Sequence, residues 1–273
     1  MNVKLIQITQ NPIEVMWVAA RTCYSEKSPI EMWEDRYGAF SDGYEHTEEY
    51  IKECAEKHWK LVKQVLSSGH QSVAEHVYFT FAIEGVDRAL THQLVRHRAG
   101  IVFSQQSQRY VEIKEDISTF EKAHYDKDNY LENTKLVEAL DKYFVWDKSN
   151  FAQFHALCNS LYSYLYQVRD GAAPEDARSV LPNATKTNIT MSCNFRELIH
   201  ICNLRLCTRA QTPIRSLFKE IVKEVEKAEP KLAELLVPNC EAQGFCSEHK
   251  CCGRKPTKEE VLEGYHKYKD LEK

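Results

Sequence analysis

Several features that would identify a protein class are scarce in this chain of 273 residues. It has only nine glycines, and none forms the G-x-G-x-x-G pattern that opens a dinucleotide-binding fold. No apolar run approaches the roughly 18 residues of a membrane span, and the first residues lack the apolar centre of a signal peptide. We therefore expect a cytoplasmic protein with no Rossmann domain and no membrane partner.

Positive charge is not in excess either. The formal net charge is −4 and the sequence pI is near 6.3, whereas a general nucleic-acid binder is usually basic overall. With 43% hydrophobic and 28% charged residues, the composition is that of an ordinary globular protein. We expect no nucleic-acid partner, and any site for an anion has to be local.

Cysteine is plentiful, with ten residues, but the spacing is not that of a disulfide framework in a secreted domain. Six are expected to pack as small apolar side chains: Cys23, Cys54, Cys158, Cys193, Cys202 and Cys207. The others, Cys240, Cys246, Cys251 and Cys252, lie close together in sequence. Because no C-x-x-C pair occurs among them, free thiols and no metal are predicted, with a zinc site as the alternative.

The densest group of polar side chains lies in RHRAGIVFSQQSQRY, residues 96–110. The triplet Arg96, His97 and Arg98 is followed by an apolar interval and then by amide and hydroxyl side chains. So many hydrogen-bond donors suit a phosphate group, and ordering them beside apolar residues is costly without a partner. A surface helix end with solvated arginines is the alternative.

Apolar periodicity predicts a small sheet with long helices. Alternation of period two places strands at residues 3–8, 77–84, 107–113 and 184–193. Helical spacing predicts helices that begin near Pro12, Glu48, Asp87, Ser149, Asn194 and Thr212. The fold class that follows is α/β (α+β), a single non-Rossmann domain with a mixed or antiparallel sheet flanked by long helices.

Three further expectations concern the segments between these elements. The helix that begins at Asp87 is expected to run to about Arg98, so that the Arg-His-Arg triplet occupies its last turn. Residues 26–46 are expected to form a loop or short turns, and residues 114–148 to pack at the periphery around one helix.

The triplet, an eight-residue spacer and Ser107-Gln108-Arg109-Tyr110 resemble the signature of the flavin-dependent thymidylate synthases, written as RHR, seven or eight residues, then Ser. The stretch Gly69-His70-x-Ser72-x-x-Glu75-His76 adds a supporting match. We accordingly expect a synthase domain at residues 1–238 and a Cys-rich tail with a C-terminal helix at residues 239–273.

The resemblance implies a methyltransferase that converts deoxyuridylate (dUMP) to thymidylate (dTMP). Methylenetetrahydrofolate would supply the carbon, and reduced FAD, regenerated by NADPH, would supply the hydride. The resemblance also implies a homotetramer whose sites combine several subunits. The alternatives are a nucleotide- or RNA-binding module that uses the arginine cluster, and a related flavoprotein with another substrate.

The resemblance also assigns ligands. Those for dUMP are Gln93, Arg96, Gln105, Gln106, Ser107, Gln108, Arg109 and Asn188. Those for FAD are His70, Ser72, Arg96, His97, Arg98, Gln105, Asn203, Arg205 and Arg209.

Arg215 is the expected catalytic residue, because a guanidinium beside the uracil favours its ionised N3 form and raises electron density at C5. A plainer interpretation of Arg205, Arg209 and Arg215 is ion pairing with Glu220 or Glu224. Asn188 departs from the family, many members of which carry arginine at this position; Lys186 is a candidate to compensate.

Overall fold

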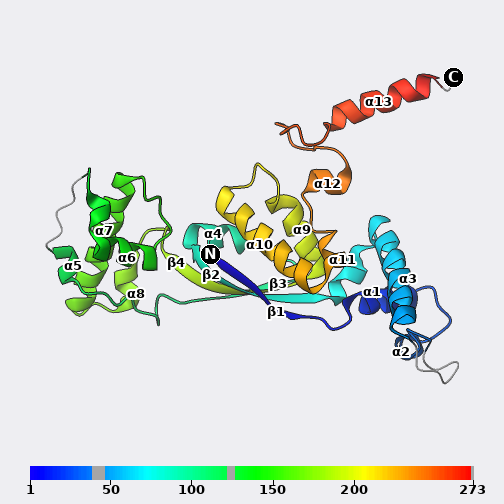
Figure 1. The fold of residues 1–273 in the computed structure, drawn as a ribbon, viewed down its shortest axis with the longest axis horizontal. Helices are drawn as coiled ribbons and strands as arrows, with labels where there is room; N and C mark the ends of the chain where they lie inside the picture. The colour runs from blue at the N-terminus through cyan, green and yellow to red at the C-terminus, as the bar shows by residue number, and fades with distance from the viewer. Residues whose placement is uncertain (39–46, 122–126, 272–273) are drawn as a thin grey trace. The chain divides into compact units, whose positions relative to one another are not determined.

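The computed structural model describes residues 1–38, 47–121 and 127–271, with side chains described as far as residue 264 (Figure 1). The chain divides into two compact units. The first consists of residues 1–2, 82–96 and 103–190, and the second of residues 3–81, 97–102 and 191–273. Among the described helices, none is both long and apolar enough to cross a bilayer.

A four-stranded antiparallel sheet has the strand order β1-β2-β4-β3. Its strands are β1 (Asn2–Ile8), β2 (Tyr78–Asp87), β3 (Ile101–Gln105) and β4 (Lys186–Asn194). The predicted α+β class is confirmed, as are the predicted strands at residues 3–8, 77–84 and 184–193.

The predicted strand at residues 107–113 is wrong. The strand is the apolar interval Ile101–Gln105, and the chain turns after it. The Ser107 hydroxyl accepts the N–H of Arg109 at 3.1 Å, and the Ser107 carbonyl accepts the N–H of Val111 at 3.0 Å. Ser107 thus uses its polar groups to close a turn, as serine commonly does.

Helix α4 (Arg88–Leu94) is shorter than predicted. Its N-cap is confirmed, since the Asp87 carboxylate accepts the N–H of Leu90 at 2.6 Å. It ends at Leu94, however, and the Arg-His-Arg triplet follows the helix instead of forming its last turn. Because β3 begins at Ile101, the five residues before it have to reverse the chain, and Gly100 does so at φ 62°.

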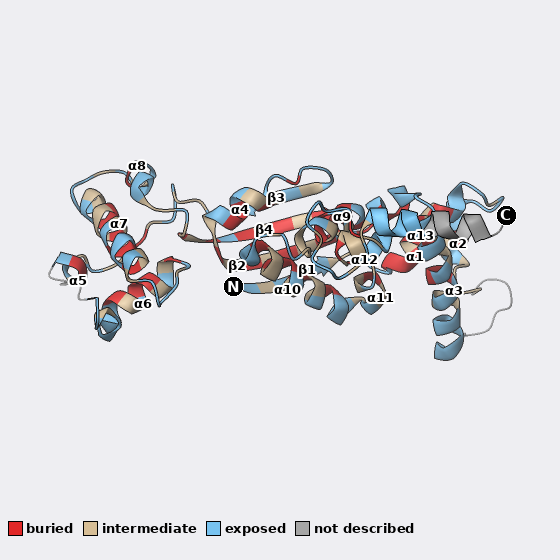
Figure 2. Cartoon of the chain, turned by 90° about the horizontal axis from the view of Figure 1, so that it is seen from above, coloured by how far each residue is buried: buried red, intermediate tan, exposed pale blue. Residues whose placement is uncertain are grey.

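The first unit has a helical core of its own. It contains α5 (Ser118–Glu121), α6 (Thr134–Tyr143), α7 (Phe151–Arg169) and α8 (Pro174–Ala177). Leu136 and Leu140 of α6 are completely buried against the stripe of α7 that the sequence predicts, which includes Phe154 and Leu161 (red in Figure 2). The expectation of peripheral packing for residues 114–148 is therefore wrong, because their apolar residues complete this core; residues 122–126 lie outside the described residues.

The second unit contains α1 (Pro12–Thr22), α2 (Pro29–Glu34), α3 (Glu48–Ser67), a 3-10 helix (Gln71–His76), α9 (Phe195–Arg205), α10 (Thr212–Ala228), α11 (Pro230–Ala233), α12 (Asn239–Gln243) and α13 (Lys258–Leu271). Helix α1 packs against α3, and the 3-10 helix packs against α1, α3 and α9. The sheet and these packed helices fix the positions of the 3-10 helix and of the start of α9.

Helix α2 corrects the prediction of a loop for residues 26–46. Ser28 accepts the N–H of Glu31, and the Glu31 carboxylate accepts the N–H of Ser28 at 2.7 Å, so a capping box starts the helix. Residues 39–46 of the same segment lie outside the described residues.

Candidate functional site

A hollow of ≈ 760 Å³ in the second unit adjoins the Arg-His-Arg triplet. It is lined by the 3-10 helix, by the turn at Ala99 and Gly100, and by one face of α9. Asn194 holds this turn to the helix: its side chain accepts the N–H of Glu197 at 2.9 Å, and its own N–H donates to the Gly100 carbonyl at 2.9 Å. The turn after the triplet is therefore fixed to the N-cap of α9.

His97 is buried beside this hollow, with 8% of its surface exposed. Arg205 donates its Nε–H to His97 Nε2 at 3.1 Å, which leaves the proton on Nδ1, and Nδ1 lies 3.6 Å from a carboxylate oxygen of Glu197. Burial, together with the nearby charges of Arg205 and His200, lowers the pKa of His97 to about 4. Burial also raises the pKa of Glu197. His97 is therefore neutral at pH 7 and its contact with Glu197 is not an ion pair.

We expect acid to destabilise the protein through His97. The unfolded chain protonates this histidine near pH 6.5, whereas the folded protein does so only near pH 4. Between these values the unfolded state holds more protons, so the free energy of unfolding falls as the pH is lowered. At about 1.4 kcal/mol for each pKa unit, the loss attributable to His97 is about 3 kcal/mol.

Denaturant titrations at pH 7, 5.5 and 4 on the wild type and on His97→Gln measure this contribution. Burial raises the pKa of Glu197, so its contribution to the free energy of unfolding changes with pH in the opposite direction. That contribution cancels when the free energies of the two proteins are subtracted. The exposed His92→Gln variant serves as the control and is expected to follow the wild-type profile. A constant difference between wild type and His97→Gln at all three pH values would contradict the expectation.

Three of the five arginines in the predicted FAD and catalytic set, Arg205, Arg209 and Arg215, are engaged within the second unit. Arg205 contacts His97, Arg209 forms an ion pair with Glu248 at 3.0 Å, and Arg215 donates to the Thr208 carbonyl at 2.7 Å. Glu220 and Glu224 pair instead with Lys223 and Lys227. The plainer interpretation, in which these glutamates neutralise the arginines, is therefore wrong.

Asn203 carries the observation that points most directly to a ligand. It lines the same hollow, and its Oδ1 atom is buried without a hydrogen-bond partner among the described residues. A buried, unpaired acceptor costs about 1 to 3 kcal/mol.

The other predicted FAD ligands near this hollow are exposed. Arg98 lies beside the turn at Ala99 and Gly100, and His70 and Ser72 lie at the start of the 3-10 helix. Glu75 pairs with Arg196 at 2.5 Å, not with His76.

A second hollow, of ≈ 580 Å³, lies within the first unit. Gln106, Ser107, Gln108 and Asn188 of the predicted dUMP set all line it. The Asn188 side chain accepts the N–H of Gly85 at 3.1 Å and donates to the Gln106 side chain at 3.3 Å. Gln108 has a buried Nε2 that finds no partner within the described part of the chain. The fold thus brings three consecutive residues and Asn188, some 80 positions later in the chain, to one cavity.

Other predicted dUMP ligands are less free to bind. The Gln105 side-chain N–H groups donate to the hydroxyls of Thr91 and Thr187, both at 3.2 Å. Arg109 pairs with Glu175 at 2.5 Å, whereas Arg96 is exposed after the end of α4. Lys186 lines the cavity but donates to the Asp141 carbonyl, so it is held by the main chain and not directed freely at a substrate.

The sequence reasoning missed some residues and misread others. Glu197 is absent from the predicted site residues, yet its carboxyl lies 3.6 Å from His97 Nδ1, and no spacing rule relates residues 100 positions apart. His200 and Arg196 share the helical face of Asn203, which was a usable signal. Arg88 was also missed: its guanidinium donates to the Gln106 carbonyl at 3.4 Å.

Comparison with known proteins assigns the chain to a family. The family model described as "Thymidylate synthase complementing protein" matches residues 4–231. The flavin-dependent thymidylate synthase of Clostridium tetani (strain Massachusetts / E88) is 38% identical over 251 residues, covering 90% of each chain. That of Nitratidesulfovibrio vulgaris is 35% identical over 267 residues, covering 95% of this chain and 97% of the relative.

The fold matches that of a solved structure. The flavin-dependent thymidylate synthase from Helicobacter pylori, crystallised with FAD and dUMP, superimposes with a TM-score of 0.63 at 22% identity, covering 87% of this chain and 100% of that chain. The sequence match over nine-tenths of the chain, the signature at residues 96–109 and the shared fold agree. The chain belongs to the flavin-dependent thymidylate synthase family.

Proposed function

We propose that the protein converts dUMP to dTMP, taking the carbon from methylenetetrahydrofolate and the hydride from reduced FAD that NADPH regenerates. The observation that carries this proposal is the cavity of ≈ 580 Å³ in which Gln106, Ser107 and Gln108 of the signature meet Asn188. A cavity of this size lies in the range for small-molecule sites. The side chains on its wall are donors and acceptors suited to a uracil ring and a phosphate.

Within this proposal, Gln108 Nε2 donates to the nucleotide, because it is buried and has no partner within the described part of the chain. The Asn188 and Gln106 side chains are already bonded to each other and to Gly85. These bonds fix the orientation of both side-chain amides before a substrate binds. In this proposal Asn188 acts by orienting Gln106, whereas the arginine that many family members carry at this position would contact the substrate directly. Arg96 supplies the exposed cation for the phosphate.

The residues around the other hollow fit a flavin nucleotide. Asn203 offers an unpaired buried acceptor, and the exposed Arg98 offers a cation for a pyrophosphate. When bound, FAD supplies hydride transfer. His97, neutral and fixed by Arg205 and Glu197, excludes water from one wall and leaves Arg205 charged beside it. His70 and Ser72 are proposed to reach the flavin of a neighbouring subunit in a homotetramer, with the synthase domain ending near residue 238.

The test is dTMP formation by the purified protein. Absorption bands near about 370 and 450 nm would report bound flavin, and turnover is then measured with dUMP, methylenetetrahydrofolate and NADPH, omitting one at a time. We expect product only in the complete mixture. Flavin reoxidation that responds to another nucleotide and ignores dUMP would favour the related flavoprotein with another substrate.

Asn203→Ala is expected to weaken FAD binding by roughly 5- to 30-fold, the equivalent of one buried hydrogen bond of about 1 to 2 kcal/mol. Its Oδ1 loses no bond within the described part of the chain, and its burial without a partner costs the apoprotein about 1 to 3 kcal/mol, so the free energy of unfolding of the apoprotein should rise by up to that amount and should not fall. Flavin fluorescence titration and denaturant melts measure the two quantities. The adjacent, exposed Leu204→Ala is the control, and equal effects of both variants on FAD affinity would contradict the assignment.

A further inference from the structure

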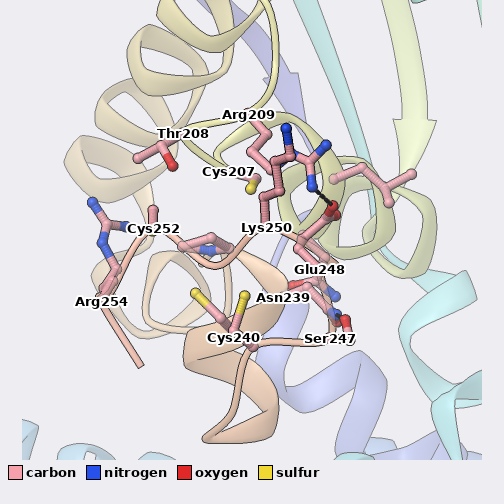
Figure 3. A pocket seen from close by; sticks show the side chains of 14 residues that line it. Cys207, Thr208, Arg209, Asn239, Cys240, Ser247, Glu248, Lys250, Cys252 and Arg254 are labelled. Carbon is pink, nitrogen blue, oxygen red and sulfur yellow. Dashed lines mark hydrogen bonds and ion pairs between the residues drawn. The ribbon is translucent and has the colours of Figure 1, made fainter. Parts of the chain in front are cut away.

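The Cys-rich tail and the end of α9 enclose a third hollow, of ≈ 160 Å³, within the second unit (Figure 3). Cys207, Thr208 and Arg209 follow α9, and Cys240, Lys250, Cys252 and Arg254 come from the tail. Within the described residues, no group of three or more His, Cys, Asp or Glu side chains is placed to hold a metal ion.

Cys252 differs from the other thiols of the hollow. It is exposed, and hydrogen bonds from the Thr208 hydroxyl and from the N–H of Arg254 lower its pKa, with a further contribution from the Arg254 guanidinium. Cys240 is half-buried, and burial raises its pKa. Since the thiolate is the reactive form of cysteine, Cys252 is the nucleophile of this group.

Cationic side chains line the same hollow as this thiol. Arg209 is neutralised by Glu248 and Arg254 by Glu241, each at 3.0 Å. Lys250 lines the same hollow and forms no ion pair in the part of the chain that the structure describes. One positive charge is thus left in excess next to an accessible thiol, and this favours an attacking partner that carries carboxylates.

We propose that Cys252 is a site of reversible S-thiolation by a low-molecular-weight disulfide that carries carboxylates, of the glutathione disulfide class. The Cys252 thiolate attacks one sulfur, a new S–S bond forms, and the old S–S bond breaks. The other half leaves as a thiolate and takes the proton that Cys252 lost. The Cys252 sulfur is oxidised and the departing sulfur is reduced, so no further oxidant is needed.

The hollow accommodates part of such a molecule. One water requires roughly 10 to 15 Å³ of such space, so ≈ 160 Å³ accepts the attacked sulfur and a neighbouring carboxylate. Lys250 then holds a carboxylate at the rim, and the rest of the adduct extends into solvent. This modification does not depend on the proposed function, and its test needs no flavin.

The experiment is incubation of the purified full-length protein with glutathione disulfide, followed over time by intact mass and peptide mapping. We expect one glutathionyl adduct, located on Cys252, removed by dithiothreitol and absent from Cys252→Ser. Cys23, an exposed thiol that does not line this hollow, serves as the matched comparison. Its labelling should be at least about tenfold slower, because it lacks the activating hydrogen bonds and cations.

The variant Lys250→Gln tests the recognition of charge. The loss of this positive charge should slow the reaction with glutathione disulfide about tenfold, and should slow the uncharged 2-hydroxyethyl disulfide much less. Equal labelling of Cys23 and Cys252 would overturn the proposal, as would equal slowing of the charged and uncharged probes. An internal disulfide between Cys252 and Cys240, formed without an adduct, would also overturn it.

Discussion

Arg215→Ala is expected to abolish most dTMP formation while the protein folds and keeps its flavin. Arg215 lies in the first turn of α10, and its guanidinium donates to the Thr208 carbonyl at 2.7 Å, which fixes its direction. A positioned charge that stabilises developing negative charge is worth about 10²- to 10³-fold in kcat. Truncation to alanine removes that charge, so the loss should appear in the methylation step.

The fold should tolerate this change, because α10 is anchored by other side chains. Ile214, Leu217 and Phe218 are completely buried, and Arg215 contributes one hydrogen bond worth about 1 kcal/mol. Flavin content by absorbance, reduction of the flavin by NADPH in a single turnover, and dTMP formation are measured separately. We expect the first two to stay near wild type.

Two variants sharpen this test. Arg215→Lys keeps the charge but loses the planar fork of donors, so it should recover part of the activity. Lys219→Ala removes an exposed cation one turn later on the same helix and should leave turnover unchanged. Wild-type turnover by Arg215→Ala would remove this residue from the mechanism, and parallel loss of flavin and of turnover would make its role structural.

Local chemistry accounts for most of the elements that the sequence predicted. The Asp87 N-cap, the Pro12 start of α1 and the apolar stripe of α7 each depend on interactions within one or two turns. The C-terminal helix predicted within residues 239–273 is present as α13, and the Glu260 N–H in its first turn donates to the Thr257 hydroxyl at 3.2 Å. Such features are determined by neighbouring residues, and a single sequence contains them in full.

The errors come from pairing between distant segments. Residues 101–105 and 107–113 are both short segments that contain apolar residues. The choice between them as the strand depends on distant partners such as the Asn188 carbonyl, which accepts the N–H of Gln106 at 2.9 Å. The cysteines show the same limit. Cys158, Cys193 and Cys202 are buried as predicted, but Cys23, which follows α1, is exposed.

The candidate site likewise combines residues that a local motif predicts with contacts between distant residues that it does not. The signature identified Gln106, Ser107 and Gln108 because the family fixes their order along the chain. The contact of His97 with Glu197 and Arg205 joins residues about 100 positions apart, and the bonds from Gln105 to two threonine hydroxyls are likewise non-local. The sequence therefore predicts which residues carry the chemistry, and the structure supplies the partners that these residues contact.

Gly100→Ala is expected to be the most destabilising single methyl addition in the second unit. Gly100 has φ 62°, and an added Cβ would lie 2.2 Å from Asn194 Nδ2. A left-handed conformation costs an alanine about 1 to 2 kcal/mol, and displacing the Asn194 cap costs about 1 kcal/mol more. Overpacking of this buried contact adds a further cost, of about 1 to 3 kcal/mol.

The expected total is a loss of about 3 to 6 kcal/mol in the free energy of unfolding, together with displacement of the turn that follows His97 and Arg98. Gly69→Ala is the matched control. Gly69 also has a positive φ, 89°, but an added Cβ meets nothing within 4 Å, so it should lose only the conformational part, about 1 to 2 kcal/mol. Denaturant melts of both variants measure the difference, which isolates the contact with Asn194.

Asn194→Ser provides the decisive second substitution, because serine still caps α9 but has a shorter side chain. If the clash causes the loss, the double variant should be more stable than the sum of the single changes implies, with a coupling of at least about 1 kcal/mol. Additive losses would show instead that Gly100 matters only for its backbone conformation. The turn after the Arg-His-Arg triplet would then be set by its dihedral angles and not by its contact with the cap of α9.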